Sequence, residues 1–129
     1  DLEKDPKAWV ESGSEDCYLF VKLEKSANFD TYMTYTIANG WTPLTGVDGV
    51  YYRKVLKSQM GESSKFEVLA GNKVSVKGTV TKADMNSLTA TTYPTLTITA
   101  YASQLYKSAG IEFTPAQAWA NANPTTTTP

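Results

Sequence analysis

The clearest pattern along the chain is an alternation of side chains between Cys17 and Glu24. The apolar set is Cys17, Leu19, Val21 and Leu23, and the intervening set is Tyr18, Phe20, Lys22 and Glu24. A period of two residues is typical of a β-strand with one face toward a core. The pattern therefore predicts a strand here, with the side chain of Cys17 on its buried face.

Further short segments with strand patterns follow, separated by turn signals. The predicted strands are 32–38, 41–44, 50–56, 66–69, 74–80 and 95–106. Asn39-Gly40 and Asp48-Gly49 are dipeptides favoured in tight hairpin turns, because such turns need positive φ at their centre. Short strands with turn signals at this spacing predict an all-β fold, an antiparallel β-sandwich.

One or two short helices are expected within this β-rich pattern. The stretch from Lys82 to Leu88 lacks alternation, and Thr81 before it is a candidate N-cap. Residues 114–117 read Thr-Pro-Ala-Gln, a capping-box arrangement with proline at the first helical position. The second pattern predicts a short helix over 116–121 that carries Trp119.

The N-terminal segment has the features of a detachable edge strand. A charged stretch becomes apolar at residues 8–10, and Ser12-Gly13-Ser14 then forms a hinge. A detached edge strand pairs with a neighbouring subunit, and repetition of that contact gives an open filament. The candidate donor strand is Lys4, Asp5, Pro6, Lys7, Ala8, Trp9 and Val10, with Trp9 and Val10 as the side chains that enter the neighbour.

The chain length of 129 residues suits one domain with its own core. We therefore expect a single sandwich domain over 1–123, with 1–10 as its detachable part. Residues 124–129 read Pro-Thr-Thr-Thr-Thr-Pro and bury little apolar area. This composition predicts a tail or a linker.

Composition narrows the classes of function. A formal net charge of −1 is unlike that of a nucleic-acid-binding protein, and no apolar run approaches the roughly 18 residues of a membrane span. The chain has no histidine and one cysteine, which removes histidine-based nucleophile systems, His-ligated metals and an intrachain disulfide. We therefore expect neither an enzyme nor a bound metal or cofactor.

The remaining acidic groups and the cysteine have ordinary structural interpretations. The carboxylates are expected at turns or on solvated faces, where pKa values stay near normal: Glu15, Asp16, Glu62, Glu67 and Asp84. Cys17 is expected to be a small buried hydrophobe, and a reactive or intermolecular thiol is the alternative.

Tyrosine and tryptophan are frequent on the predicted strands, and they suggest a second function. Aromatic side chains stack on sugars, but they also form cross-strand pairs that stabilise a sheet. The alternative function is a monomeric cell-surface adhesin or a carbohydrate-binding module on a Pro/Thr stalk. Tyr51 and Tyr52 are its candidate surface aromatics.

The order of several motifs resembles the TasA/camelysin family, secreted proteins of Gram-positive bacteria with a SipW-type signal peptide. Ser14–Leu23 resembles that family's first strand, and Gly40-Trp41 followed by Asp48–Leu56 resembles its tryptophan and tyrosine-rich strand. Leu96–Gln104 followed by Ala116–Trp119 is similar to its closing strand and Trp-bearing helix.

The resemblance implies a jelly-roll sandwich that is exported to the extracellular space or the cell-wall surface. It also implies a structural role in extracellular fibres, the biofilm matrix or a pilus-like filament. The partners would be further copies of the chain, or related matrix or pilus subunits, joined by donor-strand exchange. Some members have been described as metalloproteases, but this chain has no histidine and no HExxH-like motif, so no protease residue is assigned.

Overall fold

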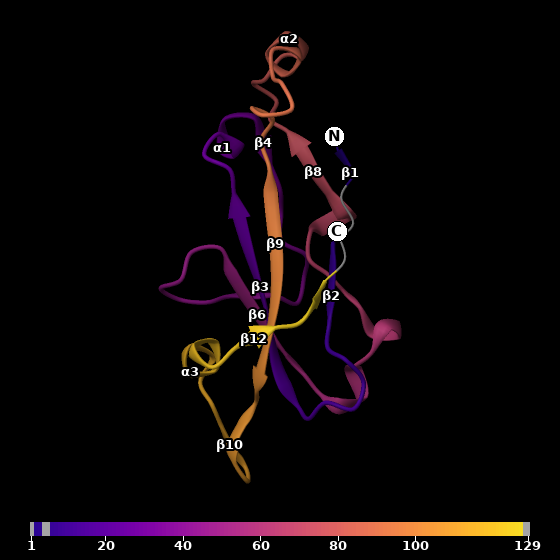
Figure 1. The fold of residues 1–129 in the computed structure, drawn as a ribbon, viewed down its shortest axis with the longest axis vertical. Coiled ribbons are helices and arrows are strands. Elements are labelled where there is room, and N and C mark those ends of the chain that lie inside the picture. The colour runs from indigo at the N-terminus through magenta and orange to yellow at the C-terminus, as the bar shows by residue number, and fades with distance from the viewer. Residues whose placement is uncertain (1, 4–5, 128–129) are drawn as a thin grey trace.

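The computed structural model describes residues 2–3 and 6–127. It is an all-β protein in which two antiparallel layers enclose the main core, as Figure 1 shows. The larger sheet has the strand order β12-β9-β3-β6-β5. Its strands are β3 (Cys17–Lys25), β5 (Thr42–Pro43), β6 (Val50–Val55), β9 (Leu96–Gln104) and β12 (Asn123–Pro124).

The opposite layer is built from two smaller sheets of short strands. One has the order β1-β8-β4 and the other β13-β2-β7. Their strands are β1 (Leu2–Glu3), β2 (Lys7–Trp9), β4 (Met33–Thr34), β7 (Phe66–Glu67), β8 (Lys73–Val76) and β13 (Thr126–Thr127). The predicted antiparallel sandwich is confirmed, although its second layer is a patchwork of two small sheets in place of one continuous sheet.

β3 lies at the centre of the larger sheet. All nine of its residues pair with β9, from Cys17 opposite Gln104 to Lys25 opposite Leu96. Its other side pairs with β6 from Cys17 opposite Val55 to Lys22 opposite Val50. The predicted inward set of β3 belongs to the main core between the layers, where Leu19 and Val21 are fully buried.

The outer face of the larger sheet is covered as well. Tyr18 and Phe20 on this face are buried in a second cluster with Leu44, Leu105 and Ala118. The cover consists of helix α3 (Pro115–Ala120), the chain around residue 44 and the segment after β9. The hairpin β10 (Tyr106–Ser108) and β11 (Ile111–Glu112) leads from β9 to α3.

Helix α3 begins at the predicted capping box. The Thr114 hydroxyl accepts a hydrogen bond from the Gln117 amide, and the Gln117 side chain accepts one from the Thr114 amide. The Trp119 ring then lies over the sheet, 5.2 Å from the Phe20 ring and 5.1 Å from the Tyr101 ring. The helix therefore closes the outer apolar face.

The other helices are short. The predicted helix after Thr81 is present as α2 (Lys82–Asn86), capped by that side chain. Helix α1 (Phe29–Tyr32) was not predicted, and single 3₁₀ turns occupy Lys57–Gln59, Glu62–Ser64 and Ala70–Asn72. Among the residues described, no helix is long and apolar enough to cross a membrane.

The Asn39-Gly40 turn does not join the hairpin that we predicted. Gly40 has a positive φ of 98° as a turn requires, but β4 before it pairs with β8, and β5 after it pairs with β6. The chain therefore changes sheet at this turn. Predicted strand 32–38 is reduced to Met33–Thr34 and a single bridge at Ile37.

The Asp48-Gly49 turn does form its predicted hairpin, between β5 and β6. Gly49 has φ of 77°, and a Cβ atom there would lie 2.6 Å from the Leu23 carbonyl oxygen. Its own carbonyl accepts a hydrogen bond from the Leu23 amide at 2.8 Å. Glycine is required here both by its backbone conformation and by its close approach to β3.

We predict that Trp119→Ala destabilises the protein by about 2 kcal/mol, because the half-buried indole covers two aromatic rings of the sheet. Urea unfolding followed by circular dichroism measures the change. Tyr106→Ala is the matched control, since that ring is 41% exposed on β10, and its effect should stay below about 0.5 kcal/mol. Equal effects of the two substitutions would contradict the role of α3 as a cover.

Candidate assembly surface and side-chain cavities

The predicted donor segment is paired within its own chain. β2 lies between β7 and β13, with Ala8 opposite Phe66 on one side and opposite Thr127 on the other. Ala8, Trp9 and Val10 are buried in the sandwich, and Pro6 is buried next to them. Lys4 and Asp5 lie outside the described residues. The segment thus fills a central place in the smaller layer, and is not an edge strand.

Backbone hydrogen bonds outside the short strand pairings also attach this segment. The Val68 amide donates to the Pro6 carbonyl at 3.2 Å, and the Gly61 amide donates to the Val10 carbonyl at 2.6 Å. The chain then enters the exposed hinge, where Gly13 has φ of 89° and open space around its Cα. A short strand is therefore followed directly by a bend that leaves the layer.

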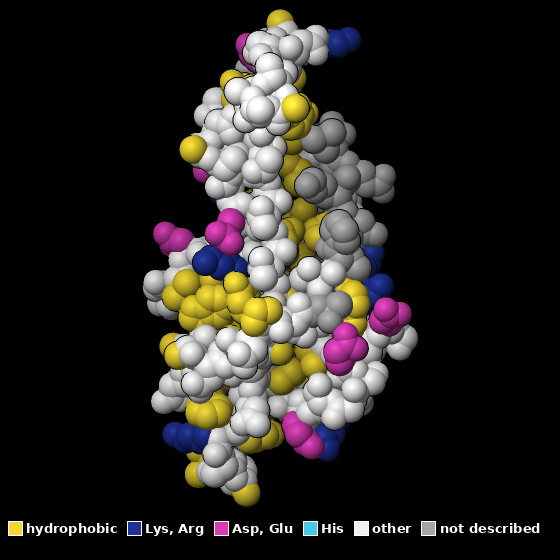
Figure 2. Space-filling model, viewed as in Figure 1, with side chains coloured by type: hydrophobic (Ala, Val, Ile, Leu, Met, Phe, Trp, Pro, Cys, Tyr) yellow, Lys and Arg dark blue, Asp and Glu magenta, His cyan; other side chains and the backbone are white. Residues whose placement is uncertain are grey.

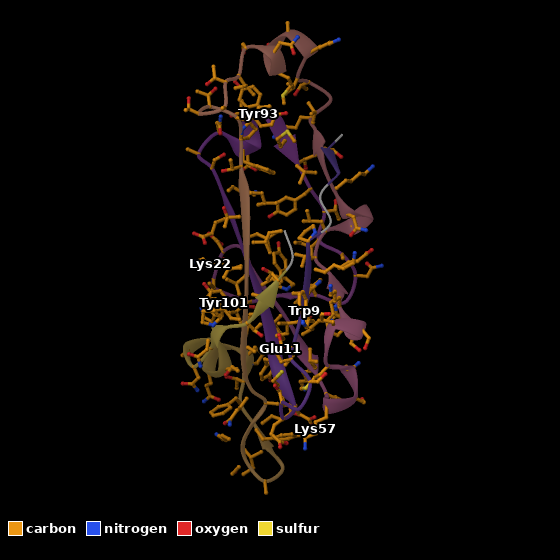
Figure 3. The ribbon with its side chains drawn as sticks, turned by 45° about the vertical axis from the view of Figure 1, so that its right-hand side comes forward. Trp9, Glu11, Lys22, Lys57, Tyr93 and Tyr101 are labelled. Carbon is orange, nitrogen blue, oxygen red and sulfur yellow. The ribbon has the colours of Figure 1, made fainter. Side chains whose placement is uncertain are left out.

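The indole of Trp9 is buried with its polar atom unsatisfied. Ala8 and Val10 on either side of it belong to the main core, whereas Trp9 belongs to neither core cluster and lies on the opposite face of β2; Figure 3 labels its position. The indole nitrogen has no hydrogen-bond acceptor among the described residues. The Lys65 ammonium lies 4.6 Å from the ring centroid. A buried N–H without an acceptor costs about 1–3 kcal/mol, so burial of the Trp9 indole is less favourable than it would be with an acceptor.

The C-terminal segment connects the two layers and is not a free linker up to Thr127. Asn123–Pro124 pairs with Ala102 and Tyr101 of β9, and Thr126–Thr127 pairs with Trp9 and Ala8 of β2. Figure 1 shows it crossing from β12 to the strand beside β2. We call Asn123–Thr127 the C-terminal strap. Backbone hydrogen bonds hold the strap in place, and the side-chain composition of this segment gives no indication of them.

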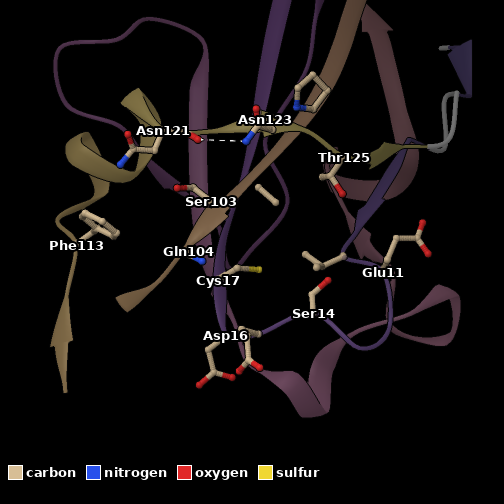
Figure 4. Close-up of a pocket in the computed structure, with 14 residues that line it drawn as sticks. Glu11, Ser14, Asp16, Cys17, Ser103, Gln104, Phe113, Asn121, Asn123 and Thr125 are labelled. Atoms are coloured by element: carbon tan, nitrogen blue, oxygen red, sulfur yellow. Dashed lines mark hydrogen bonds between the residues drawn. The ribbon is translucent and has the colours of Figure 1, made fainter. Parts of the chain in front are cut away.

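A cleft of about 590 Å³ opens beside the strap. Its wall includes Val10, Cys17 and Ser103, and the acidic side chains of Glu11, Glu15 and Asp16 also line it. Figure 4 shows β12 passing over β9 at one end of the cleft and the hinge loop along its other side. The cleft therefore separates the N-terminal segment from the end of β9.

The free edge of β9 continues beyond the strap. β12 pairs with only two residues of this edge, Tyr101 and Ala102, and Thr125 donates to the Ala100 carbonyl at 2.9 Å. No pairing on this edge is seen for residues 96–99 within the described part of the chain. Figure 2 shows hydrophobic side chains in the hollow that runs beside β9. An unpaired edge next to an apolar hollow is a place where an extended chain adds.

The two candidate surface tyrosines have different environments. Tyr52 points to the outer face, where its ring lies 6.0 Å from the ring of Tyr18 and 6.2 Å from that of Phe20. Tyr51 points inward and lines a cavity of about 460 Å³ together with Tyr35 and Lys25. Both tyrosines are half-buried. Tyr52 is mainly a packing residue, whereas Tyr51 borders open space.

The acidic side chains singled out from the sequence have structural contacts. Glu15 pairs with the Lys57 ammonium at 2.9 Å, and Asp16 accepts the Lys57 backbone amide at 2.9 Å. Asp84 caps helix α2, and the hydrogen bonds from Thr81 lower the pKa of its carboxyl. Glu67 accepts a hydrogen bond from the side-chain amide of Asn72 at 3.2 Å. Within the described residues, no three or more His, Cys, Asp or Glu side chains gather in a group that could hold a metal.

Sequence reasoning missed two features of these surfaces. The C-terminal strap has no signal in the Pro/Thr composition. Arg53, by contrast, had a signal: on β6 it shares the inward face with Tyr51 and Val55, which both contact the main core. A charged residue at an inward position of a sandwich strand breaks the apolar pattern.

Cys17 is buried as predicted, with 6% of its surface exposed. Burial, with a smaller contribution from the negative charge of Asp16, raises the pKa of its thiol to about 11 from an ordinary 9.0. At pH 8 a smaller fraction of Cys17 is therefore in the thiolate form in the folded protein than in the unfolded chain.

We predict that Cys17 reacts with a disulfide reagent at pH 8 at least about 100-fold more slowly in the folded protein than in urea. The absorbance of the released thiol measures the rate. Ser14→Cys on a Cys17→Ala background is the control, since position 14 is half-exposed at the hinge, and it should react quickly. Rapid labelling of native Cys17 would contradict its placement.

No family model, curated protein or solved structure matches this chain.

Proposed function

We propose that this chain is a secreted, non-enzymatic structural subunit of extracellular fibres, a biofilm matrix or a pilus-like filament. The proposed location is the extracellular space or cell-wall surface of a Gram-positive bacterium. Subunits would be copies of this chain, or related matrix or pilus subunits, joined by exchange of residues 4–10. The motif order that resembles the TasA/camelysin family supports this proposal.

The observation that carries the proposal is the seating of β2. Three residues of strand, Lys7–Trp9, lie between β7 and β13, with Ala8 in the main core, and Gly13 with its positive φ follows four residues after the strand. The buried Trp9 indole has no acceptor among the described residues. A short segment that places Ala8 and Val10 in the core and is followed by an exposed glycine bend is suited to leave as a unit.

Exchange of such a strand costs little at equilibrium. The vacated slot would expose buried residues of the main core, including Val68 and Leu69, and this exposure is unfavourable in proportion to the apolar area. A second copy's residues 7–10 restore the same contacts in the same slot. The balance then depends on protein concentration and on the conformation of the hinge, as in domain swapping.

The exchange can be detected by a disulfide across β2 and β7. Lys7 lies directly opposite Glu67, so cysteines at these positions can be joined. On a Cys17→Ala background, Lys7→Cys/Glu67→Cys should give intrachain disulfides in dilute monomer. In concentrated, filament-forming samples it should give a ladder of covalent oligomers on non-reducing gels.

The control pair is Glu24→Cys/Thr97→Cys on the same background. These positions are opposite each other on β3 and β9, both are exposed, and they lie in a different sheet from β2. The control should stay monomeric on gels under every condition. Filaments in which Lys7→Cys/Glu67→Cys joins only within chains would refute strand exchange.

A deletion of residues 1–10 tests the same proposal without cysteines. The truncated chain should form no filaments in electron micrographs, because it has no strand to donate. It should bind a synthetic peptide of residues 1–12, and the same peptide with Trp9→Ala and Val10→Ala should bind at least about tenfold more weakly. If both the full and truncated chains stay monomeric, or both form filaments alike, the proposal fails.

A carbohydrate-binding module is the second candidate, favoured by the placement of Tyr51. Tyr35, Tyr51 and Lys25 border one cavity, and the Lys25 ammonium lies 5.4 Å from the Tyr35 ring centroid. Binding on a glycan array should be lost in Tyr51→Ala and kept in folded Tyr52→Ala, since Tyr52 packs against Tyr18 and Phe20. An array without any bound glycan would eliminate this candidate.

A further inference from the structure

Arg53 projects between the two layers near the β6 side of the sandwich. Its guanidinium carbon lies 4.1 Å from the Phe66 ring centroid and 4.9 Å from that of Trp41. The guanidinium also lies against Gly40, where an added Cβ atom would collide with it. The two rings and this glycine therefore restrict where the guanidinium can lie.

The N–H groups of this guanidinium have no partner among the described residues. Neither a hydrogen bond nor an ion pair to Arg53 is formed there, and the guanidinium packs against the two aromatic rings and Gly40. Burial lowers the pKa of Arg53, and no carboxylate offsets this. Arg53 is half-buried, and its N–H groups are not among the buried side-chain atoms that lack a partner, so they can donate to a ligand that enters from solvent.

The same guanidinium lines a cavity of about 440 Å³ that has a second cation and several neutral polar groups. Lys65 contributes the second positive charge, and Thr36 and Asn39 contribute a hydroxyl and an amide. Glu67 also lines the cavity and is engaged by Asn72. The Lys65 ammonium rests over Trp9, and no ion pair to it is present in the described part of the chain.

We propose that this cavity binds a sugar acid, with the carboxylate held by Arg53 and Lys65 and the hydroxyl groups held by polar side chains on the cavity wall. The fork of a guanidinium matches a carboxylate in two parallel hydrogen bonds. The volume lies within the range of small-molecule sites and exceeds what a bare carboxylate needs. This site is distinct from the Tyr51 cavity, and it borders the donor strand through β7, whose Phe66 and Glu67 pair with Ala8 and Lys7.

Nuclear magnetic resonance titration of the full chain with glucuronate tests the site. The Trp41 indole N–H donates to the Glu67 carbonyl at 2.7 Å beside the guanidinium, so its resonance should shift and saturate. Glucose, which lacks the charge, should leave it unmoved. Acetate and sulfate are tested as free anions and should bind at least about tenfold more weakly than glucuronate.

Arg53→Gln should weaken glucuronate binding at least about tenfold, and Arg53→Lys should recover only part of it, because lysine lacks the fork. Lys65→Gln is the second variant if Arg53→Gln does not fold, since Lys65 is exposed; it should weaken binding several-fold. Lys22→Gln is the control: it removes a positive charge on β3, outside this cavity, and should leave glucuronate binding unchanged.

Three outcomes would overturn the proposal. In the first, glucuronate produces no saturable shift. In the second, acetate or sulfate binds as tightly as glucuronate, so that the site takes any anion. In the third, binding survives in folded Arg53→Gln but is lost in Tyr51→Ala, which would place the sugar in the neighbouring cavity.

Discussion

The structure depends on β3, a strand that is apolar on both faces and paired on both edges. Leu19 and Val21 enter the main core, while Tyr18 and Phe20 are buried on the opposite face. A sheet built around such a strand must be covered on both sides, because either face left bare would expose large aromatic or aliphatic surface. The rest of the chain supplies these two covers.

The two covers are made in different ways. The outer cover is continuous in sequence: β9 leads through a hairpin to α3, and the Trp119 ring lies over Phe20 and Tyr101. The inner cover is assembled from short strands far apart in sequence, and β2 and the C-terminal strap come from opposite ends of the chain. The strands of this cover are short, two to four residues each. The proposed strand exchange therefore involves a segment of the inner cover and leaves the outer cover in place.

Arg53 is a charged residue at a strand position where the pattern favours an apolar one, and its packing shows how the fold accommodates it. Its place on β6 puts a charge at an inward position, and the chain accommodates that charge with two aromatic faces in place of a carboxylate. Such stacking satisfies the face of the guanidinium but leaves its N–H edge unpaired. The edge therefore remains available to a ligand, in a cavity whose wall includes β7, the strand paired with β2.

The local pattern of residues determined much about this protein by itself. Alternation identified β3, β6 and β9, and for β3 also the face that enters the main core, because a period of two is a local property. Side-chain caps likewise determined where α2 and α3 begin, since capping involves residues three positions apart.

Only the tertiary structure decided which strands pair: the Asn39-Gly40 turn changes sheets, β2 is central, and the strap joins the two layers. These pairings are backbone contacts between residues as distant as Trp9 and Thr126, and side-chain patterns carry no information about which distant backbone a strand will meet. The same reason explains the cavities, because Arg53, Phe66 and Trp41 become neighbours only when the layers pack.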